Sequence, residues 1–173
     1  VVCEENNVGN CIIKWETAPV LKGQVKVYTS TSPEAIPEDS PIAMANISSG
    51  KMTIVTNDPS QRYYYLMVFN NKYRVKVATR NINIPGIQNF RDLGGYESAS
   101  TGKSLRWGMI YRSAQIDSIP PCSRQELKNM GIRTIIDLRS ESERHNYPQL
   151  HDDKFKIVHI RSEERRVGKE CRS

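Results

Sequence analysis

Arginine recurs in four short strings of this sequence, three of which also contain glycine and two of which also contain aspartate. Residues 89–96 read N-F-R-D-L-G-G-Y, and related strings follow at residues 106–108, 111–113 and 131–139. The planar guanidinium group of arginine matches a phosphate with two parallel hydrogen bonds, and a neighbouring aspartate can hold that group in place. Glycine lets the backbone come close to a ligand. The combination predicts a site that binds an anion.

Nine residues are the candidates for supporting a phosphate or active site: Asn89, Phe90, Arg91, Asp92, Gly94, Gly95, Arg112, Asp137 and Arg139. Taken singly, each signal has a structural alternative. Asp137 and Arg139 could form an ion pair that only stabilises the fold, and Gly94-Gly95 could be only a turn. Phe90 is expected to be a packing anchor rather than a residue that stacks on a substrate.

The elements that would position these residues follow an α/β pattern from residue 81 onward. Residues 104–112 and 155–160 are expected to be strands, and residues 132–138 an apolar parallel strand covered on both faces. Two Ser-x-x-Glu capping boxes, at residues 123–126 and 140–143, predict helix starts, and Gly131 is expected to end the first helix. Sites in α/β sheets form beyond the carboxyl ends of such strands.

The first 80 residues have a different pattern. Apolar residues alternate with polar ones in short runs between residues 11 and 79, separated by turn signals, which favours an antiparallel β-sandwich. Asn70-Asn71 suits a hairpin turn with positive φ. We therefore expect two domains, an all-β antiparallel sandwich over residues 1–80 and an incomplete α/β domain over residues 81–160, with the boundary near Arg80.

The sandwich region resembles a fibronectin type III or immunoglobulin-like module. The resemblance rests on an early strand with Ile13-Lys14-Trp15 and a late strand that begins with Tyr63-Tyr64-Tyr65. Trp15 is expected to be a core residue between the two sheets. The tyrosine run is expected to contribute to the core on one face and to be exposed on the other.

The four strings quoted first resemble the bacterial tyrosine phosphatases that carry an N-F-R-D-L-G-G-Y motif. The resemblance covers residues 84–160, and some members of that family have a small β-sandwich in front. It implies a cysteine-dependent phosphatase that acts on phosphotyrosine, and also on phosphoserine, phosphothreonine or phosphoinositides. It implies no cofactor and no metal. The expected partner is a phosphorylated protein or phosphoinositide substrate.

The family's chemistry needs a cysteine followed six positions later by an arginine, in a loop that opens a helix. No cysteine of this sequence meets that requirement: the residues six positions after Cys3, Cys11 and Cys122 are Gly9, Thr17 and Lys128, and only two residues follow Cys171. The sequence therefore holds no catalytic nucleophile, and we expect the 173-residue chain to be inactive.

Residues 161–173 resemble the in-frame translation of a common sequencing adapter, which begins with Arg-Ser-Glu-Glu. The alternative is a genuine basic helical tail. The first interpretation predicts a gene fragment that stops before its catalytic loop, and the missing initiator Met likewise suggests a cut N-terminus.

The remaining composition limits the function classes. The net charge is +6 and the mean hydropathy −0.58, but no basic block with interleaved aromatics occurs in the first 160 residues, so no nucleic-acid partner is expected. No apolar run reaches the length of a membrane helix. Cys3 and Cys11 could form a disulfide in an exported or cell-surface protein, or Cys3 could be frayed and Cys11 simply buried. Oligomeric state stays open.

Two rival functions remain. One is an adhesion or ligand-binding protein that acts through the sandwich. The other is a phosphate-binding pseudophosphatase, whose native gene would also lack the cysteine.

Overall fold

The computed structural model describes residues 1–6, 9–55, 58, 61–147, 150 and 152–160. It is made mostly of antiparallel sheets with few helices, and it falls into two compact units. Unit 1 comprises Val1–Ile82 together with Asn89–Arg112, and unit 2 comprises Asn83–Gln88 together with the rest of the chain. The expected domain boundary near Arg80 remains a prediction. The expectation for residues 161–173 lies outside the described residues.

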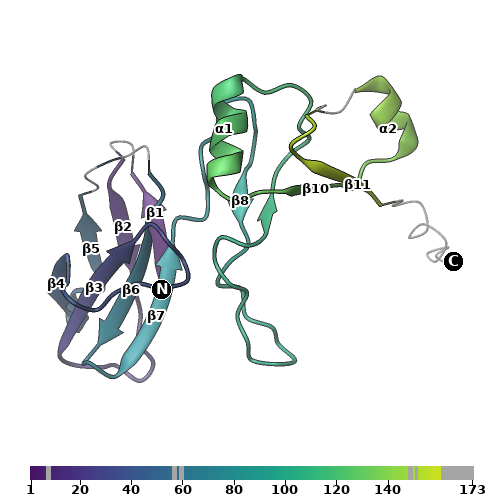
Figure 1. Cartoon of the computed structure of the whole chain (residues 1–173). Coiled ribbons are helices and arrows are strands. Elements are labelled where there is room, and N and C mark those ends of the chain that lie inside the picture. Colours follow the sequence, from purple (N-terminus) through teal and green to yellow (C-terminus); the bar gives the residue numbers. More distant parts are fainter. Residues whose placement is uncertain (7–8, 56–57, 59–60, 148–149, 151, 161–173) are drawn as a thin grey trace, which may run out of the picture. The chain divides into compact units, whose positions relative to one another are not determined.

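Unit 1 is built around two antiparallel sheets (Figure 1). The first sheet has the order β1-β2-β5, with bounds Val2–Glu5, Cys11–Lys14 and Lys51–Ile54. The second has the order β4-β3-β6-β7, with bounds Ala43–Asn46, Gln24–Ser30, Tyr64–Phe69 and Tyr73–Ala78. A 3-10 helix, η1 (Ile47–Ser49), precedes β5. Buried side chains from both sheets form one apolar cluster, so the two sheets pack as a sandwich.

The inner core confirms two expectations and decides between two alternatives for the cysteines. Trp15 is buried, its ring lies edge-on to Phe69 with centroids 6.2 Å apart, and its Nε1 donates to the carbonyl of Ile47 at 2.8 Å. Asn70 and Asn71 have φ values of 50° and 56° in the turn between β6 and β7. Cys3 and Cys11 form a disulfide. The alternative with a frayed Cys3 is therefore wrong.

Strand β6 corrects the expectation of one exposed face. All six of its residues are buried, including Tyr64 and Tyr65. Tyr65, Met67 and Phe69 lie in the inter-sheet core. The alternate residues belong to a second apolar cluster on the outer face of the sheet, whose members are Tyr28, Ile36, Tyr64, Leu66, Val68, Ala78 and Trp107. A strand without polar alternation is buried on both sides, and here the outer cover includes a residue from beyond position 100.

The 89–96 motif belongs to unit 1. It contains β8 (Arg91–Asp92), which pairs antiparallel with β9 (Tyr111–Arg112). Residues 104–112 do not form the expected continuous strand, because only the last two of them are in β9. The intervening segment turns back on itself, with Leu105 N donating to the carbonyl of Tyr96.

Unit 2 contains α1 (Pro121–Asn129), β10 (Thr134–Asp137), α2 (Glu141–Asn146) and β11 (Lys156–His159). Strands β10 and β11 pair in parallel, as expected for an α/β domain (Figure 1). Strand β10 is not covered on both faces: Ile136 is 57% exposed. In the described part of the chain, β11 is the one neighbour of β10 in the sheet. Apolar side chains of residues 132–138 are therefore left partly exposed.

The two capping boxes have different outcomes. The box at residues 140–143 is confirmed, since Ser140 and Glu143 exchange side-chain and backbone hydrogen bonds at the start of α2. The box at residues 123–126 is wrong. Helix α1 begins at Pro121, a residue type that suits the first helical turn, and the buried Ser123 hydroxyl instead donates to the carbonyl of Pro85 at 2.7 Å. Within the described residues, no helix combines the length and apolar character that crossing a bilayer requires.

Candidate functional site

Two arginines face each other across the short ribbon of β8 and β9. Arg91 and Arg112 are Cα partners in the antiparallel register. Like charges in directly opposite positions repel each other, and neither side chain has an acidic partner among the described residues. The Nε of Arg91 is buried without a hydrogen-bond partner in that part of the chain. An anion bound between the two guanidinium groups would relieve the repulsion between them.

Asp92, the next residue, is turned away from solvent and is 0% exposed. Its Oδ2 accepts from Arg62 Nη2 at 2.7 Å and from the backbone N–H of Gly108 at 2.8 Å. Its Oδ1 accepts from the backbone N–H of Gly94 at 2.7 Å. These bonds satisfy a buried charge that would otherwise be costly. Asp92 therefore organises the loop and is not available to a substrate.

Arg62 brings further groups together at this point. Its Nη2 also donates to the carbonyl of Thr79 at 3.2 Å, and its Nη1 donates to the hydroxyl of Tyr111 at 3.3 Å. The guanidinium group lies 4.9 Å from the ring centroid of Tyr64, a distance at which a cation is attracted to the ring face. Arg62 precedes β6 of the sandwich, so the sandwich provides the countercharge for Asp92.

Arg80 holds the backbone of the motif. It donates to the carbonyl of Asp92 at 2.8 Å and to that of Gly94 at 3.0 Å. Its guanidinium group lies 4.0 Å from the ring centroid of Tyr96 and 5.1 Å from that of Trp107. The backbones of the two residues are bonded as well, because Asp92 N donates to the carbonyl of Arg80 at 3.0 Å.

The two glycines of the motif make room for Trp107. A Cβ placed on Gly94 would lie 2.5 Å from the Trp107 Cα, and one on Gly95 would lie 2.8 Å from the indole ring. Gly95 also has a φ of 74°, which favours glycine. The side chain of Trp107 is buried in the outer apolar cluster of the sandwich. Close packing explains both glycines here.

Phe90 is buried and stacks on Tyr111, with ring centroids 5.2 Å apart and an interplanar angle of 18°. This is the packing role expected for Phe90. Burial raises the pKa of the Tyr111 hydroxyl well above its usual range, so Tyr111 stays neutral and can accept from Arg62. Asn89, just before Phe90, is exposed and has a φ of 56°, a conformation that asparagine tolerates.

A second arginine–aspartate cluster lies in unit 2, where β10 ends. Arg139 Nε donates to Asp137 Oδ1 at 3.0 Å and its Nη2 donates to Oδ2 at 3.1 Å. Arg139 Nη1 also donates to Asp117 Oδ1 at 3.3 Å and to the carbonyl of Tyr147 at 3.1 Å. The Nδ1 of His159, at the end of β11, is 3.6 Å from Asp137 Oδ2.

The electrostatics of Asp137 reflect two opposing causes. Burial by itself raises the pKa of this carboxyl, while the side-chain and backbone hydrogen bonds from Arg139 and the charge of Arg139 lower it. The net direction is downward, so Asp137 is ionised at neutral pH and serves as the anionic partner of Arg139. Within the described residues, no cluster of His, Cys, Asp and Glu side chains suits a metal ion.

The structure thus distributes the nine candidate residues over two clusters. Residues 89–95 and Arg112 belong to unit 1, and Asp137 and Arg139 belong to unit 2. Sequence reasoning missed Arg62 and Arg80, which hold the first cluster, and Asp117, which extends the second. Trp107 lay in the string at residues 106–108, but no role was assigned to it. One signal was present: the unbroken apolar run at β6 indicates that something covers its outer face. No sequence signal marks Arg62.

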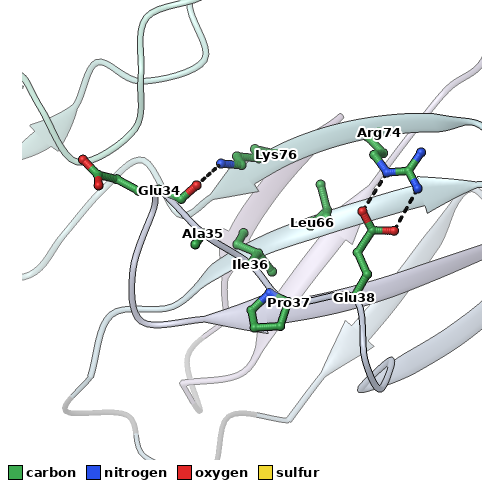
Figure 2. A pocket seen from close by; sticks show the side chains of 8 residues that line it. All are labelled: Glu34, Ala35, Ile36, Pro37, Glu38, Leu66, Arg74 and Lys76. Atoms are coloured by element: carbon green, nitrogen blue, oxygen red, sulfur yellow. Dashed lines mark hydrogen bonds and ion pairs between the residues drawn. The ribbon is translucent and has the colours of Figure 1, made fainter.

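Unit 1 also has a hollow on the outer face of the sandwich, lined by Glu34, Ala35, Ile36, Pro37, Glu38, Leu66, Arg74 and Lys76 (Figure 2). Its charged groups are paired within the chain. Arg74 forms two hydrogen bonds with Glu38, at 2.7 and 2.9 Å, and Lys76 Nζ donates to the carbonyls of Pro33 and Glu34. The hollow therefore offers a ligand little free charge, in contrast to the Arg91–Arg112 ribbon.

Comparison with known proteins assigns the chain to a family. Residues 82–172 match the tyrosine phosphatase family, and the chain belongs to this family. A stretch of 60 residues is 37% identical to the triple specificity protein phosphatase PtpB of Mycobacterium tuberculosis. That stretch is 35% of this chain and 20% of the relative, so the chain spans about a fifth of the length of the curated relative it matches.

Proposed function

We propose that the protein to which this chain belongs hydrolyses phosphate monoesters, with phosphotyrosine as the principal substrate and phosphoserine, phosphothreonine or phosphoinositides as further ones. The match of residues 82–172 to the tyrosine phosphatase family carries this proposal. In the proposed reaction a cysteine thiolate attacks phosphorus and forms a phosphocysteine, while the ester oxygen leaves with a proton from a general acid. Water then hydrolyses the intermediate and releases phosphate.

Arg91 and Arg112 are proposed to bind the phosphate group of the substrate. Their opposed positions on β8 and β9, without an acidic partner in the described residues, support this role. Asp92, Gly94 and Gly95 are proposed to keep the ribbon in shape, together with Asn89 and Phe90. Asp137 and Arg139 are proposed to support the site through their mutual bonds rather than to transfer a proton.

The nucleophile itself has no counterpart in this sequence, because no cysteine is followed six positions later by arginine. We therefore propose that turnover requires a loop outside these 173 residues. The 173-residue chain should release no phosphate from an aryl phosphate above the rate of a buffer control. Site-specific turnover by this chain would contradict the proposal.

The positive test uses the longer gene product with its cysteine loop. It should release phosphate from phosphotyrosine peptides and trap a phosphocysteine on rapid acid quench. Arg91→Ala should lower kcat/KM by about 10- to 100-fold, the effect of losing one charged phosphate contact. Arg74→Ala, which removes an exposed arginine paired with Glu38, is the matched control and should leave kcat/KM unchanged. If Arg91→Ala lowers only the melting temperature, Arg91 is a structural residue.

The sandwich is proposed to be a fibronectin type III or immunoglobulin-like module of an exported protein. Its sheets of three and four antiparallel strands support the first part. The Cys3–Cys11 disulfide supports the second, because disulfides persist in oxidising compartments.

A further inference from the structure

The 89–96 motif lies within the family match, but the groups that hold it come from before that match begins. Residues 82–172 carry the family resemblance. Arg62 and Arg80, which bind the side chain and the backbone of the motif, precede residue 82. Tyr64, Leu66 and Val68, which share an apolar cluster with Trp107, precede it as well.

From this arrangement we infer that Arg62 and Arg80 are positioning residues for the phosphatase motif, and that the sandwich is an integral part of the phosphatase rather than a separable binding module. The inference goes beyond the proposed function, because it concerns how the motif is held and not what it acts on. Three independent observations carry it: a buried charge, a clamped backbone and a shared apolar cluster.

The buried charge is the strongest of these. Asp92 is 0% exposed, and the countercharge within the described residues is Arg62, whose side chain is 14% exposed. A carboxylate without solvent and without its arginine would be left as an uncompensated buried charge. The same carboxylate accepts hydrogen bonds from the N–H groups of Gly94, in the motif, and Gly108, next to Trp107. Its position therefore fixes the backbone of both segments.

The backbone clamp acts next to Arg91 and Arg112, the two residues proposed to bind phosphate. Arg80 donates to the carbonyls of Asp92 and Gly94, and its own carbonyl accepts from Asp92 N. Asp92 follows Arg91 in β8, and its Cα partner Tyr111 precedes Arg112 in β9. Tyr111 in turn accepts from Arg62 through its hydroxyl. The sandwich therefore contacts the neighbours of both arginines.

The apolar cluster makes separation unfavourable for the sandwich as well. Removing the segment that contains Trp107 would expose the outer face of β6, whose Tyr64, Leu66 and Val68 are buried. Exposed apolar surface of this kind promotes association. The segment with Trp107 and the outer face of β6 thus bury each other's apolar side chains.

The test measures hydrogen exchange at individual amides in the full 173-residue chain. The reporters are the N–H groups of Gly94 and Gly108, which donate to Asp92. The reference amides are those of β3 and β6, which pair in the sandwich. The variants are Arg62→Met, the milder Arg62→Lys, and the control Arg74→Met, which removes a sandwich arginine whose partner is the exposed Glu38.

Arg62→Met should accelerate exchange at Gly94 and Gly108 by about a hundredfold or more, the factor that corresponds to leaving a buried carboxylate without its partner. Arg62→Lys should give a smaller acceleration, since lysine keeps the charge but not the fork. Arg74→Met should leave both reporters unchanged. The β3 and β6 amides should change by less than about threefold in Arg62→Lys.

Two results would overturn the inference. Unchanged exchange at Gly94 and Gly108 in Arg62→Met would show that Arg62 does not position the motif. Equal acceleration at the reporters and at β3 and β6, in Arg62→Lys as well as Arg62→Met, would show a general stabilising role instead. Neither result depends on turnover, so the proposed function is judged separately.

Discussion

Asp92 and Asp137 each accept several hydrogen bonds, at least one of them from an arginine side chain, and they differ in where that arginine lies in the sequence. Asp137 is bound by Arg139, two residues further along the same strand end. Asp92 is bound by Arg62, which lies 30 residues earlier, in the sandwich. A local pair needs only the conformation of its own segment. A long-range pair joins two segments, so its loss affects both.

The surroundings of the two aspartates sharpen this difference. Asp92 is 0% exposed, and Arg62, which binds it, is itself mostly buried. Asp137 is 7% exposed, and the backbone N–H of Arg139 and the ring of His159 would remain beside it if the Arg139 side chain were removed. We therefore expect substitutions in the first cluster to have the larger effects.

The largest effect is expected for Arg62→Met. The variant leaves Asp92 charged, buried and without its arginine, which should lower the free energy of unfolding of unit 1 by about 3–5 kcal/mol. Urea unfolding followed by tryptophan fluorescence measures this, since Trp15 and Trp107, the two tryptophans of the sequence, both belong to unit 1. A loss below about 1 kcal/mol would mean that Asp92 finds other compensation.

Gly94→Ala should follow, with a loss of about 1–3 kcal/mol in unit 1. Its Cβ would collide with the backbone of Trp107, which cannot move aside as a flexible side chain can. Gly131→Ala in unit 2 is the matched control, because a Cβ there meets nothing within 4 Å and only its φ of 77° opposes the change. Gly94 itself has no positive φ, so a Gly94→Ala variant without a measurable loss would show that contact with Trp107 does not explain this glycine.

Arg139→Met should cost unit 2 about 1–2 kcal/mol, less than Arg62→Met costs unit 1. The reason is that Asp137 keeps the hydrogen bond from the Arg139 backbone. Amide exchange of β10 and β11 measures the effect. A loss as large as that of Arg62→Met would show that proximity in sequence does not make a pair less critical.

The smallest effect is a pH dependence of unit 2. The pKa of Asp137 is lowered in the folded state, so its ionised form stabilises the fold above the pKa of the unfolded chain. This contribution should be lost as pH falls through the lowered folded-state pKa. Amide exchange of β10 between neutral and strongly acidic pH follows the loss, and Asp137→Asn should remove the part that belongs to this residue. An identical pH profile in Asp137→Asn would exclude Asp137 as its source.

Sequence patterns predicted the elements that depend on neighbouring residues. Alternation indicated the sandwich strands, Asn70-Asn71 the hairpin turn, and Ser140–Glu143 the start of α2, because each depends on local backbone chemistry. The capping box at Ser123 failed because Pro121 begins the helix earlier and the serine hydroxyl has a tertiary partner in Pro85. The partner of Asp92 could not be predicted, since nothing near Arg62 in the sequence distinguishes it from the other arginines of the chain.

The role of the motif residues shows the same limit. The types of residue in the 89–96 motif suggested an anion site, but not which of them would face an anion. Asp92 and the two glycines are occupied by Arg62, Gly108 and Trp107, whereas Arg91 and Arg112 are the cations of the ribbon without an acidic partner in the described chain. Only the three-dimensional arrangement separates the residues that hold the loop from those that could bind a phosphate.

A double-mutant cycle on Arg62 and Asp92 tests the central claim, that the sandwich provides the charge on which the phosphatase motif depends. The cycle compares the unfolding free energies of the 173-residue chain, Arg62→Met, Asp92→Asn and the double variant. If the two side chains stabilise each other, the double variant should be more stable than the sum of the single losses predicts, by about 2–3 kcal/mol. Additivity within about 0.5 kcal/mol would contradict the account.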